Sequence, residues 1–452
     1  MTLPNAAVNR ATGGWAIHNQ KEDPRMPNPI QPRTIQIDSS SHCQLACRNC
    51  PTASRAIRPL VGAGHLQFAN FQTLIERNPW LAEMELANWG EMFLNPRLVD
   101  MLQFAAERKI SLHGDDGANL NFATEKTLEA LVKYRLRSLT CALDGATPET
   151  YSQYRVRGNL ERVIGHIESI NRYRRAYSSG LPALTWQFVL FGHNQHEVEL
   201  ARARAARLGM RFVVKLAWDG AFSPIRDAEA ARLAARTRFV SRDEFRAATG
   251  INYKRSICYQ LWSNPSINWD GRMLGCCHNY WGEFGGNAFT GDLLELVNGG
   301  RMRYARDMLM GCVPARDDIP CSACDLYREL RETGRWITDE ELVPQLREPG
   351  ILLSVVVKSG RTDLTHADIF VVSGSRLDPI QAVRPPVGER FTLGESFSVC
   401  CTLPRPGEYT ICAIPRRIDP TFRAPNPRLP VVTRCFTAPA RPVSQEETIT
   451  ID

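Results

Sequence analysis

Three cysteines near the start of the chain have a spacing that suits a metal cluster. Cys43, Cys47 and Cys50 form the pattern C-x3-C-x2-C directly after the short run Thr34–Asp38. Three thiolates on one loop can hold three irons of a [4Fe–4S] cube, which leaves the fourth iron open to a small molecule. A zinc knuckle is the alternative, but zinc needs a fourth Cys or His at a matching spacing, and His42 is poorly placed for it.

A second set of cysteines lies in the middle of the chain. Cys258 is followed after twelve residues by Gly271 and after four more by Cys276. Farther on, Cys321 and Cys324 form a C-x2-C pair. Four thiolates saturate a [4Fe–4S] cluster, which then suits electron transfer rather than chelation of a substrate. A structural zinc site with the same thiolates is the alternative.

The other cysteines and the N-terminus indicate the compartment. The chain carries 14 cysteines, and Met1–Pro32 lacks the apolar core of a secretory signal. This combination indicates a reducing compartment and metal ligation, so we expect a cytoplasmic protein. Cys277 and Cys312 are expected to be packing thiols, unless either one replaces a named cluster ligand. Four further cysteines are expected to fill the core of the C-terminal part, namely Cys400, Cys401, Cys412 and Cys435.

The composition bounds the class of protein. With 452 residues the chain suits two or three domains, and 43% hydrophobic and 23% charged residues are typical of a globular protein. It has no run of about 18 apolar residues, so no membrane span is expected. The net charge of +7 comes from 55 basic and 48 acidic residues without a dense basic block. Nucleic-acid binding is therefore not expected.

Apolar runs alternate with amphipathic stretches in the first half of the chain. We expect strands at 34–38, 83–87, 110–113, 139–143, 184–190 and 211–216, and helices at 96–108, 124–134, 148–155, 160–174 and 195–208. These βα units predict an α/β fold with a parallel sheet, arranged as a partial (β/α)6 TIM-like barrel. In barrel folds the chemistry sits at the carboxyl ends of the strands.

Polar residues lie at or near these strand ends. Asp115 and Asp116 could bind a hydroxylated or cationic substrate or act as a base, with a polar turn as the alternative. Strand alternation allows Gln187 and Lys215 to point inward but does not fix the phase. Asp144 is either a site residue or the cap of the following helix. The other candidates are Trp89, Gly90, Glu91, Arg155 and Asn194.

These motifs resemble those of the radical S-adenosylmethionine (SAM) superfamily. Its cluster signature resembles Cys43–Cys50, and its "GGE–P" motif resembles Asn88–Pro96, where Trp89 replaces the first Gly. A further family stretch resembles Ala142–Tyr151, whose usual Ser is an Ala here. The resemblance implies that SAM binds the open iron and is cleaved to methionine and a 5′-deoxyadenosyl radical. It also implies SAM-binding roles for Trp89, Gly90, Glu91, Asp144, Arg155, Gln187 and Asn194, while Asp115, Asp116 and Lys215 are the expected catalytic residues.

The middle cysteine set resembles the twitch domain, the half-length version of the SPASM domain of radical SAM enzymes. We expect an N-terminal arm (1–33), the partial barrel (34–220), a linker with a small α+β twitch-type auxiliary cluster domain (221–349) and an antiparallel β-sandwich (350–452). The sandwich follows from period-two runs between Pro/Gly-rich turns. Two [4Fe–4S] clusters and SAM are then the expected cofactors.

The expected activity is hydrogen abstraction and net oxidation of a sugar-like or aminocyclitol substrate, with the auxiliary cluster accepting an electron. Only 42 residues precede the cluster motif, too few for the recognition domain that many peptide maturases carry there. The alternatives are a maturase with a carrier or peptide substrate, a redox-neutral epimerase or lyase in which Cys277 returns a hydrogen, and a non-catalytic metal-binding protein. An enzyme of this kind needs an external one-electron reductant of the flavodoxin or ferredoxin type.

Overall fold

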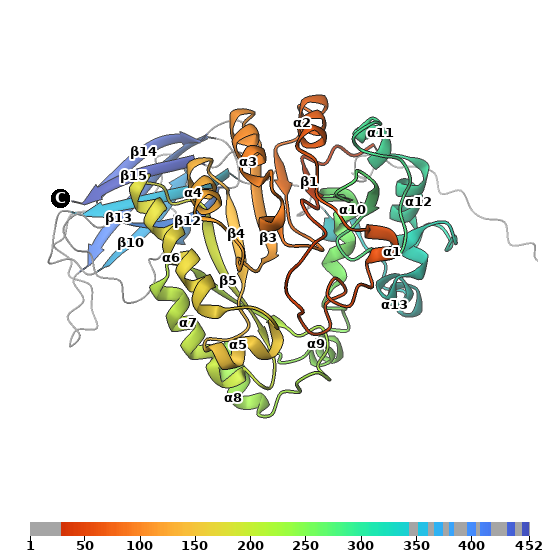
Figure 1. Cartoon of the computed structure of the whole chain (residues 1–452), viewed down its shortest axis with the longest axis horizontal. Helices are drawn as coiled ribbons and strands as arrows, with labels where there is room; N and C mark the ends of the chain where they lie inside the picture. Colours follow the sequence, from red (N-terminus) through yellow and green to blue (C-terminus); the bar gives the residue numbers. More distant parts are fainter. Residues whose placement is uncertain are drawn as a thin grey trace, which may run out of the picture.

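Eight strands form one sheet in the first three quarters of the chain (Figure 1). The computed structural model describes residues 29–342, 351–359, 366–373, 379–383, 396–403, 407–416, 432–438 and 445–451, so most of the expected N-terminal arm lies outside it. The strand order is β6-β5-β4-β3-β2-β1-β7-β8. The strands are β1 (Thr34–Ile37), β2 (Glu83–Glu85), β3 (Ser111–Ala118), β4 (Ser138–Ala142), β5 (Ala183–Leu190), β6 (Arg211–Leu216), β7 (Ser266–Ile267) and β8 (Met273–Gly275).

Strands β1 to β6 are parallel and lie in chain order, which confirms the predicted α/β architecture. Thr124, Thr147 and Asn159 each accept a backbone N–H three residues on, which sets the start of the helix that follows. In the part of the chain that the structure describes, no helix is both long and apolar enough to cross a membrane. The helices between the strands are α1 (Arg58–Val61), α2 (Phe68–Arg77), η1 (Met92–Leu94), α3 (Leu98–Glu107), α4 (Glu125–Lys133), α5 (Pro148–Tyr154), α6 (Leu160–Ala176), η2 (Gln195–Glu197) and α7 (Val198–Arg207).

The two faces of this sheet differ in polarity. Met84 and Trp186 are fully buried in one hydrophobic core with helix residues, which marks the outer face. Gln36 aligns with Glu85, and Glu85 aligns with His113, so these three polar residues share the opposite face. The register of β5 and β6 places Gln187 and Lys215 on that face too. We call this polar side, defined by Gln36, Glu85, His113, Gln187 and Lys215, the inner face.

Strand β3 is longer than predicted and carries a wide bulge. Residues 114 and 118 align with residues 139 and 141 of β4, so β3 holds two extra residues. Gly117 in the bulge has a φ of +106°, a conformation that favours glycine. A bulge breaks the alternation of side chains, which lets the consecutive residues Asp115 and Asp116 both serve the inner face. They therefore belong to the strand, and the interpretation of this segment as a turn after it is wrong.

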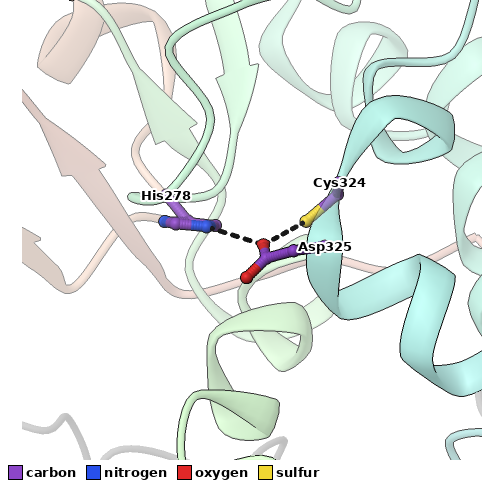
Figure 2. A group of neighbouring side chains, drawn as sticks. All are labelled: His278, Cys324 and Asp325. Atoms are coloured by element: carbon purple, nitrogen blue, oxygen red, sulfur yellow. Dashed lines mark hydrogen bonds and ion pairs between the residues drawn. The ribbon is translucent and has the colours of Figure 1, made fainter. Parts of the chain in front are cut away.

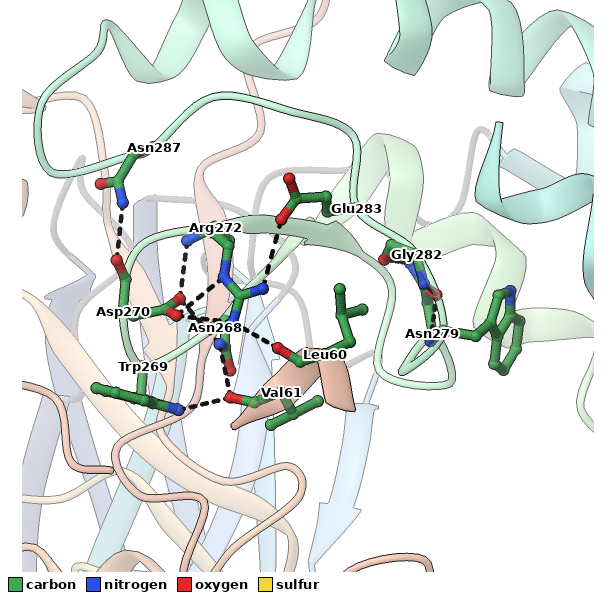
Figure 3. Close-up of polar contacts among 11 residues, drawn as sticks. Leu60, Val61, Asn268, Trp269, Asp270, Arg272, Asn279, Gly282, Glu283 and Asn287 are labelled. Carbon is green, nitrogen blue, oxygen red and sulfur yellow. Dashed lines mark hydrogen bonds and ion pairs between the residues drawn. The ribbon is translucent and has the colours of Figure 1, made fainter. Parts of the chain in front are cut away.

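The part expected to form the auxiliary domain joins the same sheet. Strands β7 and β8 form an antiparallel hairpin, and β7 pairs in parallel with β1. At the hairpin turn, Arg272 binds Asp270 at 2.9 Å and donates to the carbonyl oxygen of Leu60 (Figure 3). Trp269 donates to the carbonyl oxygen of Val61 at 2.8 Å. These bonds fix α1 to the hairpin. The helices of this part are α8 (Ala228–Ala235), α9 (Arg242–Thr249), η3 (Arg255–Tyr259), α10 (Gln260–Ser263), α11 (Leu293–Val297), α12 (Gly300–Leu309), η4 (Pro320–Ala323), α13 (Asp325–Thr333) and α14 (Asp339–Leu342).

The C-terminal strands form two further sheets, ordered β11-β10-β13-β14 and β12-β9-β15. Strands β11 and β15 were not predicted, and β15 pairs in parallel with β9, so the expectation of a wholly antiparallel arrangement is wrong. Cys412 is buried as expected, whereas Cys435 is exposed, and the side chains of Cys400 and Cys401 lie outside the described residues. The strands are β9 (Ile351–Ser359), β10 (His366–Ser373), β11 (Pro379–Val383), β12 (Ser396–Leu403), β13 (Gly407–Arg416), β14 (Val432–Ala438) and β15 (Gln445–Ile451).

Candidate functional site

The loop that carries Cys43, Cys47 and Cys50 is fastened to the carboxyl ends of the neighbouring elements. Ser39 donates its N–H to a carbonyl oxygen just after β2 at 3.1 Å, and Ala46 donates to one just after α5 at 3.0 Å. Burial, a nearby carboxylate and the two other thiols raise the pKa of Cys43 to about 12. The three thiols therefore lie close enough to act on one another.

Two side chains direct N–H groups at these sulfurs. Asn119 Nδ2 lies 3.6 Å from Cys43 Sγ, and Arg155 Nη1 lies 3.7 Å from Cys47 Sγ. Hydrogen bonds to ligand sulfurs stabilise the negative charge of an iron–sulfur cluster and tune its potential. The chemistry of this donor set therefore fits a [4Fe–4S] cluster.

The segment after β2 packs directly on the cysteine loop. A Cβ atom at Gly90 would lie 1.9 Å from the carbonyl oxygen of Ser40, so only glycine allows the two main chains to approach. Glu91 donates its N–H to the carbonyl oxygen of His42 at 2.7 Å. Glycine at position 90 thus allows this segment to pack against the main chain of the cysteine loop.

Glu91 and Trp89 connect this segment to its surroundings. The buried Glu91 carboxylate accepts the N–H of Asn119 at 2.7 Å and that of Phe93 at 3.3 Å. Burial raises the pKa of Glu91 to about 7. The ring of Trp89 packs edge-on against Tyr280 of the auxiliary part, with 5.3 Å between centroids. The segment therefore touches both cysteine-bearing parts of the chain.

The buried Asp144 and the partly buried Arg155 form an ion pair beside the cysteine loop. Nε of Arg155 lies 2.6 Å from Oδ2 of Asp144, whose other oxygen accepts the N–H of Val189 at 2.7 Å. Burial lowers the pKa of Arg155, but Asp144 and Cys47 outweigh it and hold this pKa well above its usual value. Thr147 caps α5, so the alternative that Asp144 caps this helix is wrong.

Asn194 and Glu197 hold the loops around this ion pair. The amide of Asn194 is fully buried and makes three bonds of 2.8 to 3.0 Å to the backbone at the carboxyl ends of β4 and β5, which gives it a structural role there. Glu197, which sequence reasoning missed, accepts the N–H of Ala146 at 2.6 Å and the hydroxyls of Thr147 at 2.6 Å and Thr150 at 2.9 Å. A Glu close to a predicted helix start was the only available signal.

The two carboxylates of the β3 bulge have different partners. Asp115 accepts the hydroxyls of Ser138 at 2.7 Å and Thr140 at 3.2 Å. Asp116 accepts the side-chain amide of Gln36. Asp115 is thus held by β4, whereas Asp116 reaches across β2 to β1.

These partners give the Asp115 and Asp116 carboxyl groups different pKa values. Burial raises the pKa of Asp115, but hydrogen bonds from His113 and Ser138 outweigh it and lower that pKa overall. Solvent reaches Asp116, yet the surrounding protein atoms remove much of its hydration. This desolvation and the charge of Glu85 raise the pKa of Asp116 to about 7, while Lys215 acts in the opposite direction. Asp116 is therefore the carboxylate suited to exchange a proton near neutral pH.

Glu85 and His113 complete this network, and sequence reasoning missed both. His113 Nδ1 lies 2.7 Å from Glu85 Oε2 and 3.4 Å from Asp115 Oδ2. Burial lowers the pKa of His113, but the two carboxylates outweigh it and raise the pKa to about 10, so the ring is cationic at neutral pH. Two glutamates in the Glu83–Glu85 run were a signal that one face of this strand is polar.

Three buried oxygen atoms near these groups accept no hydrogen bond from the described residues. They belong to residues that are at most 7% exposed: Gln36 Oε1, Asp38 Oδ2 and Gln187 Oε1. The Gln187 amide lies 3.4 Å from where a Cβ of Gly117 would stand. A buried polar atom without a partner is costly, so these atoms point to a polar ligand.

The four cysteines of the middle set also converge. Burial raises the pKa of Cys258, and Cys276, Cys321 and Cys324 raise it further, so the four thiols lie within electrostatic reach of one another. Cys312 is exposed. The four convergent thiols fit the expected [4Fe–4S] cluster with four thiolate ligands.

A charged group borders this second set (Figure 2). Asp325 Oδ1 lies 3.1 Å from His278 Nε2 and 3.7 Å from Cys324 Sγ. Lys254 Nζ binds the other Asp325 oxygen at 3.1 Å, and Trp218 stacks on His278 with 6.2 Å between centroids. Hydrogen bonds from His278 and Lys254 depress the pKa of Asp325, so an ionised carboxylate lies beside the sulfur of Cys324.

No family model and no curated protein matches this chain. Among solved structures it is similar to SuiB of Streptococcus suis bound to S-adenosylmethionine, at 14% identity over 66% of this chain and 71% of that one, with a TM-score of 0.47. It is similar to BtrN in complex with AdoMet and 2-DOIA, at 14% identity over 65% and 93%, with a TM-score of 0.38. It is also similar to HemN from Escherichia coli, described as a radical SAM enzyme, at 12% identity over 46% and 48%, with a TM-score of 0.28. The chain is thus similar in structure to radical SAM enzymes.

Proposed function

We propose that this chain is a radical SAM enzyme in which Cys43, Cys47 and Cys50 hold an open [4Fe–4S] cluster. When bound, this cluster and SAM supply a 5′-deoxyadenosyl radical, and a second cluster on Cys258, Cys276, Cys321 and Cys324 supplies an electron acceptor. One observation carries the proposal: Asn119 and Arg155 direct N–H groups at two of the three thiols, and buried oxygens of the inner face accept no hydrogen bond from the described residues.

The residues around the cysteine loop are the proposed SAM site. Arg155 is oriented by Asp144 and would bind the SAM carboxylate as a fork. Glu91, Gly90 and Trp89 would form the wall for the ammonium group, and Gln187 Oε1 would accept from the adenosine part. Asn194 would act indirectly, because its amide is committed to the carbonyl oxygens of Asp144 and of Val189 in β5.

The unpartnered oxygens of the inner face favour a substrate with many hydrogen-bond donors. Asp116 and Lys215 flank it, and Gln36 Oε1 accepts no hydrogen bond from the described residues. Ammonium and hydroxyl groups on one small ring would satisfy these acceptors. We therefore propose an aminocyclitol or a related amino sugar, oxidised at a carbon that bears a hydroxyl, with Asp116 taking the proton. The electrons for SAM cleavage would come from a flavodoxin- or ferredoxin-type protein.

Anaerobic reconstitution tests the proposal. We expect about eight irons per chain and formation of 5′-deoxyadenosine from SAM under reducing conditions. Cys47→Ala should abolish 5′-deoxyadenosine formation and leave about four irons. A panel of aminocyclitols with deuterium at single carbons would then reveal the attacked position by transfer of deuterium into 5′-deoxyadenosine. A protein that binds a single zinc and leaves SAM intact would be a metal-binding protein of another class.

A further inference from the structure

Trp218 is an exposed aromatic side chain at the carboxyl end of the last barrel strand. It is the second residue after β6 and is 58% exposed. Its ring lies against His278 of the auxiliary part, with 6.2 Å between centroids and 25° between the ring planes. The next residue, Asp219, accepts the side-chain amide of Asn49 from the cysteine loop at 3.1 Å. Trp218 is therefore held between the two cysteine-bearing parts of the chain and is open to solvent.

A short series of contacts leads from the second cysteine set to Trp218. Cys324 Sγ lies 3.7 Å from Oδ1 of Asp325, and the same oxygen lies 3.1 Å from Nε2 of His278 (Figure 2). The ring of His278 then contacts Trp218. Cys324 itself is buried. Because electron tunnelling slows steeply with distance, this series of contacts favours electron exchange between the second cluster and a partner at the surface.

Cations lie over the ring of Trp218. The guanidinium carbon of Arg242 is 4.5 Å from the ring centroid, and Nζ of Lys254 is 5.4 Å from it. Lys254 is paired with Asp325. Arg242 donates only to the carbonyl oxygen of Leu216 among the residues that the structure describes. The positive charge of Arg242 is thus left without a carboxylate beside the exposed ring.

A third cation comes from the cysteine loop. Arg48 precedes Asn49 and lies over the ring of Phe222, with 5.4 Å to the centroid. The loop after β6 that carries Trp218 also carries Phe222. Three cations near Trp218, namely Arg48, Arg242 and Lys254, outnumber the carboxylates of Asp219 and Asp325. We call the surface formed by Trp218 and these three cations the Trp218 patch.

We propose that the Trp218 patch is the docking site of an acidic, flavodoxin-type carrier, which takes up an electron from the second cluster there. Uncompensated cations attract an acidic partner and orient it before contact. A tryptophan among charged groups is a frequent anchor of protein interfaces. The inference rests on the proposed function for the presence of the second cluster, but it does not depend on the identity of the substrate.

The step moves one electron and no atoms. The reduced second cluster loses one electron, and the oxidised carrier gains it, so no bond forms or breaks. The same class of carrier supplies the electron for SAM cleavage in the proposed function. Over one turnover the carrier is therefore restored, while SAM and substrate give methionine, 5′-deoxyadenosine, oxidised substrate and one proton.

A chain without the first cluster isolates this electron transfer. Cys47→Ala should keep about four irons, which can be reduced with dithionite, freed of excess reductant and mixed with oxidised flavodoxin. Adding Trp218→Ala should slow the formation of flavodoxin semiquinone about tenfold, the loss that removal of an aromatic anchor brings. Trp218→Phe keeps a ring and should recover most of the rate. Tyr177→Ala is the control, because Tyr177 is an exposed aromatic residue just after α6, and this variant should leave the rate unchanged.

The reduction potential of the second cluster separates a route from a change in driving force. Trp218 contacts His278 rather than a cysteine, so Trp218→Ala should leave this potential unchanged. A shift in potential that accounts for the slower transfer would overturn the inference. Equal rates in Trp218→Ala and Tyr177→Ala, with four irons retained, would also overturn it and leave the proposed function intact. A Cys47→Ala chain that binds no iron would remove the second cluster and with it the proposed function.

Salt tests the acidic nature of the carrier. The screening length falls from about 30 Å at about 0.01 M salt to about 3 Å at about 1 M. The second-order rate constant with flavodoxin should fall about tenfold over this range, and it should fall less in Arg242→Gln. A rate constant that does not depend on salt would overturn docking through opposite charges.

Discussion

At the scale of single residues, the clearest difference in role is between the consecutive carboxylates Asp115 and Asp116. Asp115 is ionised and tied to the cationic ring of His113 and to two hydroxyls. Asp116 keeps one amide partner and has a pKa of about 7. The first stabilises the network, and the second can exchange a proton at neutral pH. Groups whose surroundings push their pKa values apart are typical of acid–base assignments.

Asp116→Asn should test this assignment through the pH dependence of substrate oxidation. A carboxylic acid acts as a base only when deprotonated, so a pKa of about 7 predicts that the wild-type rate rises between about pH 6 and pH 8. The variant should lose this rise and about 100-fold in product formation. Its 5′-deoxyadenosine yield should change far less, because hydrogen abstraction precedes the proton loss.

Product formation by Asp116→Asn with an unchanged pH profile would assign the base elsewhere. Asp115→Asn is the matched control for this measurement. Because the pKa of Asp115 is lowered, this variant should leave the rise of the oxidation rate near pH 7 unchanged.

The residue types were predictable, but their pairings were not. The cysteine sets, Asp144 and Arg155 followed from spacing and resemblance. Glu85 and His113 were missed because they lie inside strands, and their contact depends on the register of β2 and β3. The partner of Asp116, Gln36, lies two strands away. Such contacts arise from tertiary structure and leave no local periodicity.

At the scale of elements, the positions of the site residues depend on two unusual backbone stretches. The bulge in β3 places adjacent carboxylates in one network, and Gly117 supplies its positive φ. The segment at Gly90 lies so close to Ser40 that no side chain fits between them. Both positions need glycine for reasons of space or conformation.

Gly90→Ala should therefore displace the cysteine loop. The added Cβ would meet backbone atoms, which cannot give way as a flexible side chain could. We expect loss of the first cluster, with iron falling from about eight to about four per chain and no SAM cleavage. Gly165→Ala is the control, because a Cβ at this position in α6 meets nothing within 4 Å, and there we expect a gain of about 1 kcal/mol in stability. Full iron content in Gly90→Ala would show that the cysteine loop can shift to accommodate the added methyl group and still bind the cluster.

Six barrel strands and their helices could be predicted because alternating βα units are strongly periodic. The extension of β3 could not, since its Gly-Asp-Asp-Gly stretch has a low strand propensity and is held by partners on β1 and β4. Strand β15 was missed for another reason. The parallel pairing of β15 with β9 joins segments far apart in the sequence, so no turn signals it.

At the scale of the whole molecule, both cysteine sets belong to parts that share one sheet. The loop with the first set follows β1, and the hairpin beside the second set continues the sheet through β7. Arg272 and Trp269 add bonds to α1, which follows the first set. A ligand that stabilises either part should therefore stabilise the other.

Loading with iron and sulfide should raise the melting temperature of the two cysteine-bearing parts together, in one transition. Ligands that bind only the native state add their binding free energy to stability, and we expect a rise on the order of 10 °C. Cys321→Ser should show a smaller rise in the single transition. Two separate transitions, one for each cysteine set, would show that the shared sheet does not couple the two parts.

The addition of β7 to β1 also bears on the solubility of the chain. Strand β1 has β2 on one side and β7 on the other, so neither row of its backbone hydrogen-bonding groups faces water along the paired residues. A molecule in which the hairpin failed to dock would show β1 as an open edge, and open edges recruit strands from other molecules. Aggregation through β1, rather than simple loss of an electron acceptor, is the damage we expect when the auxiliary part misfolds.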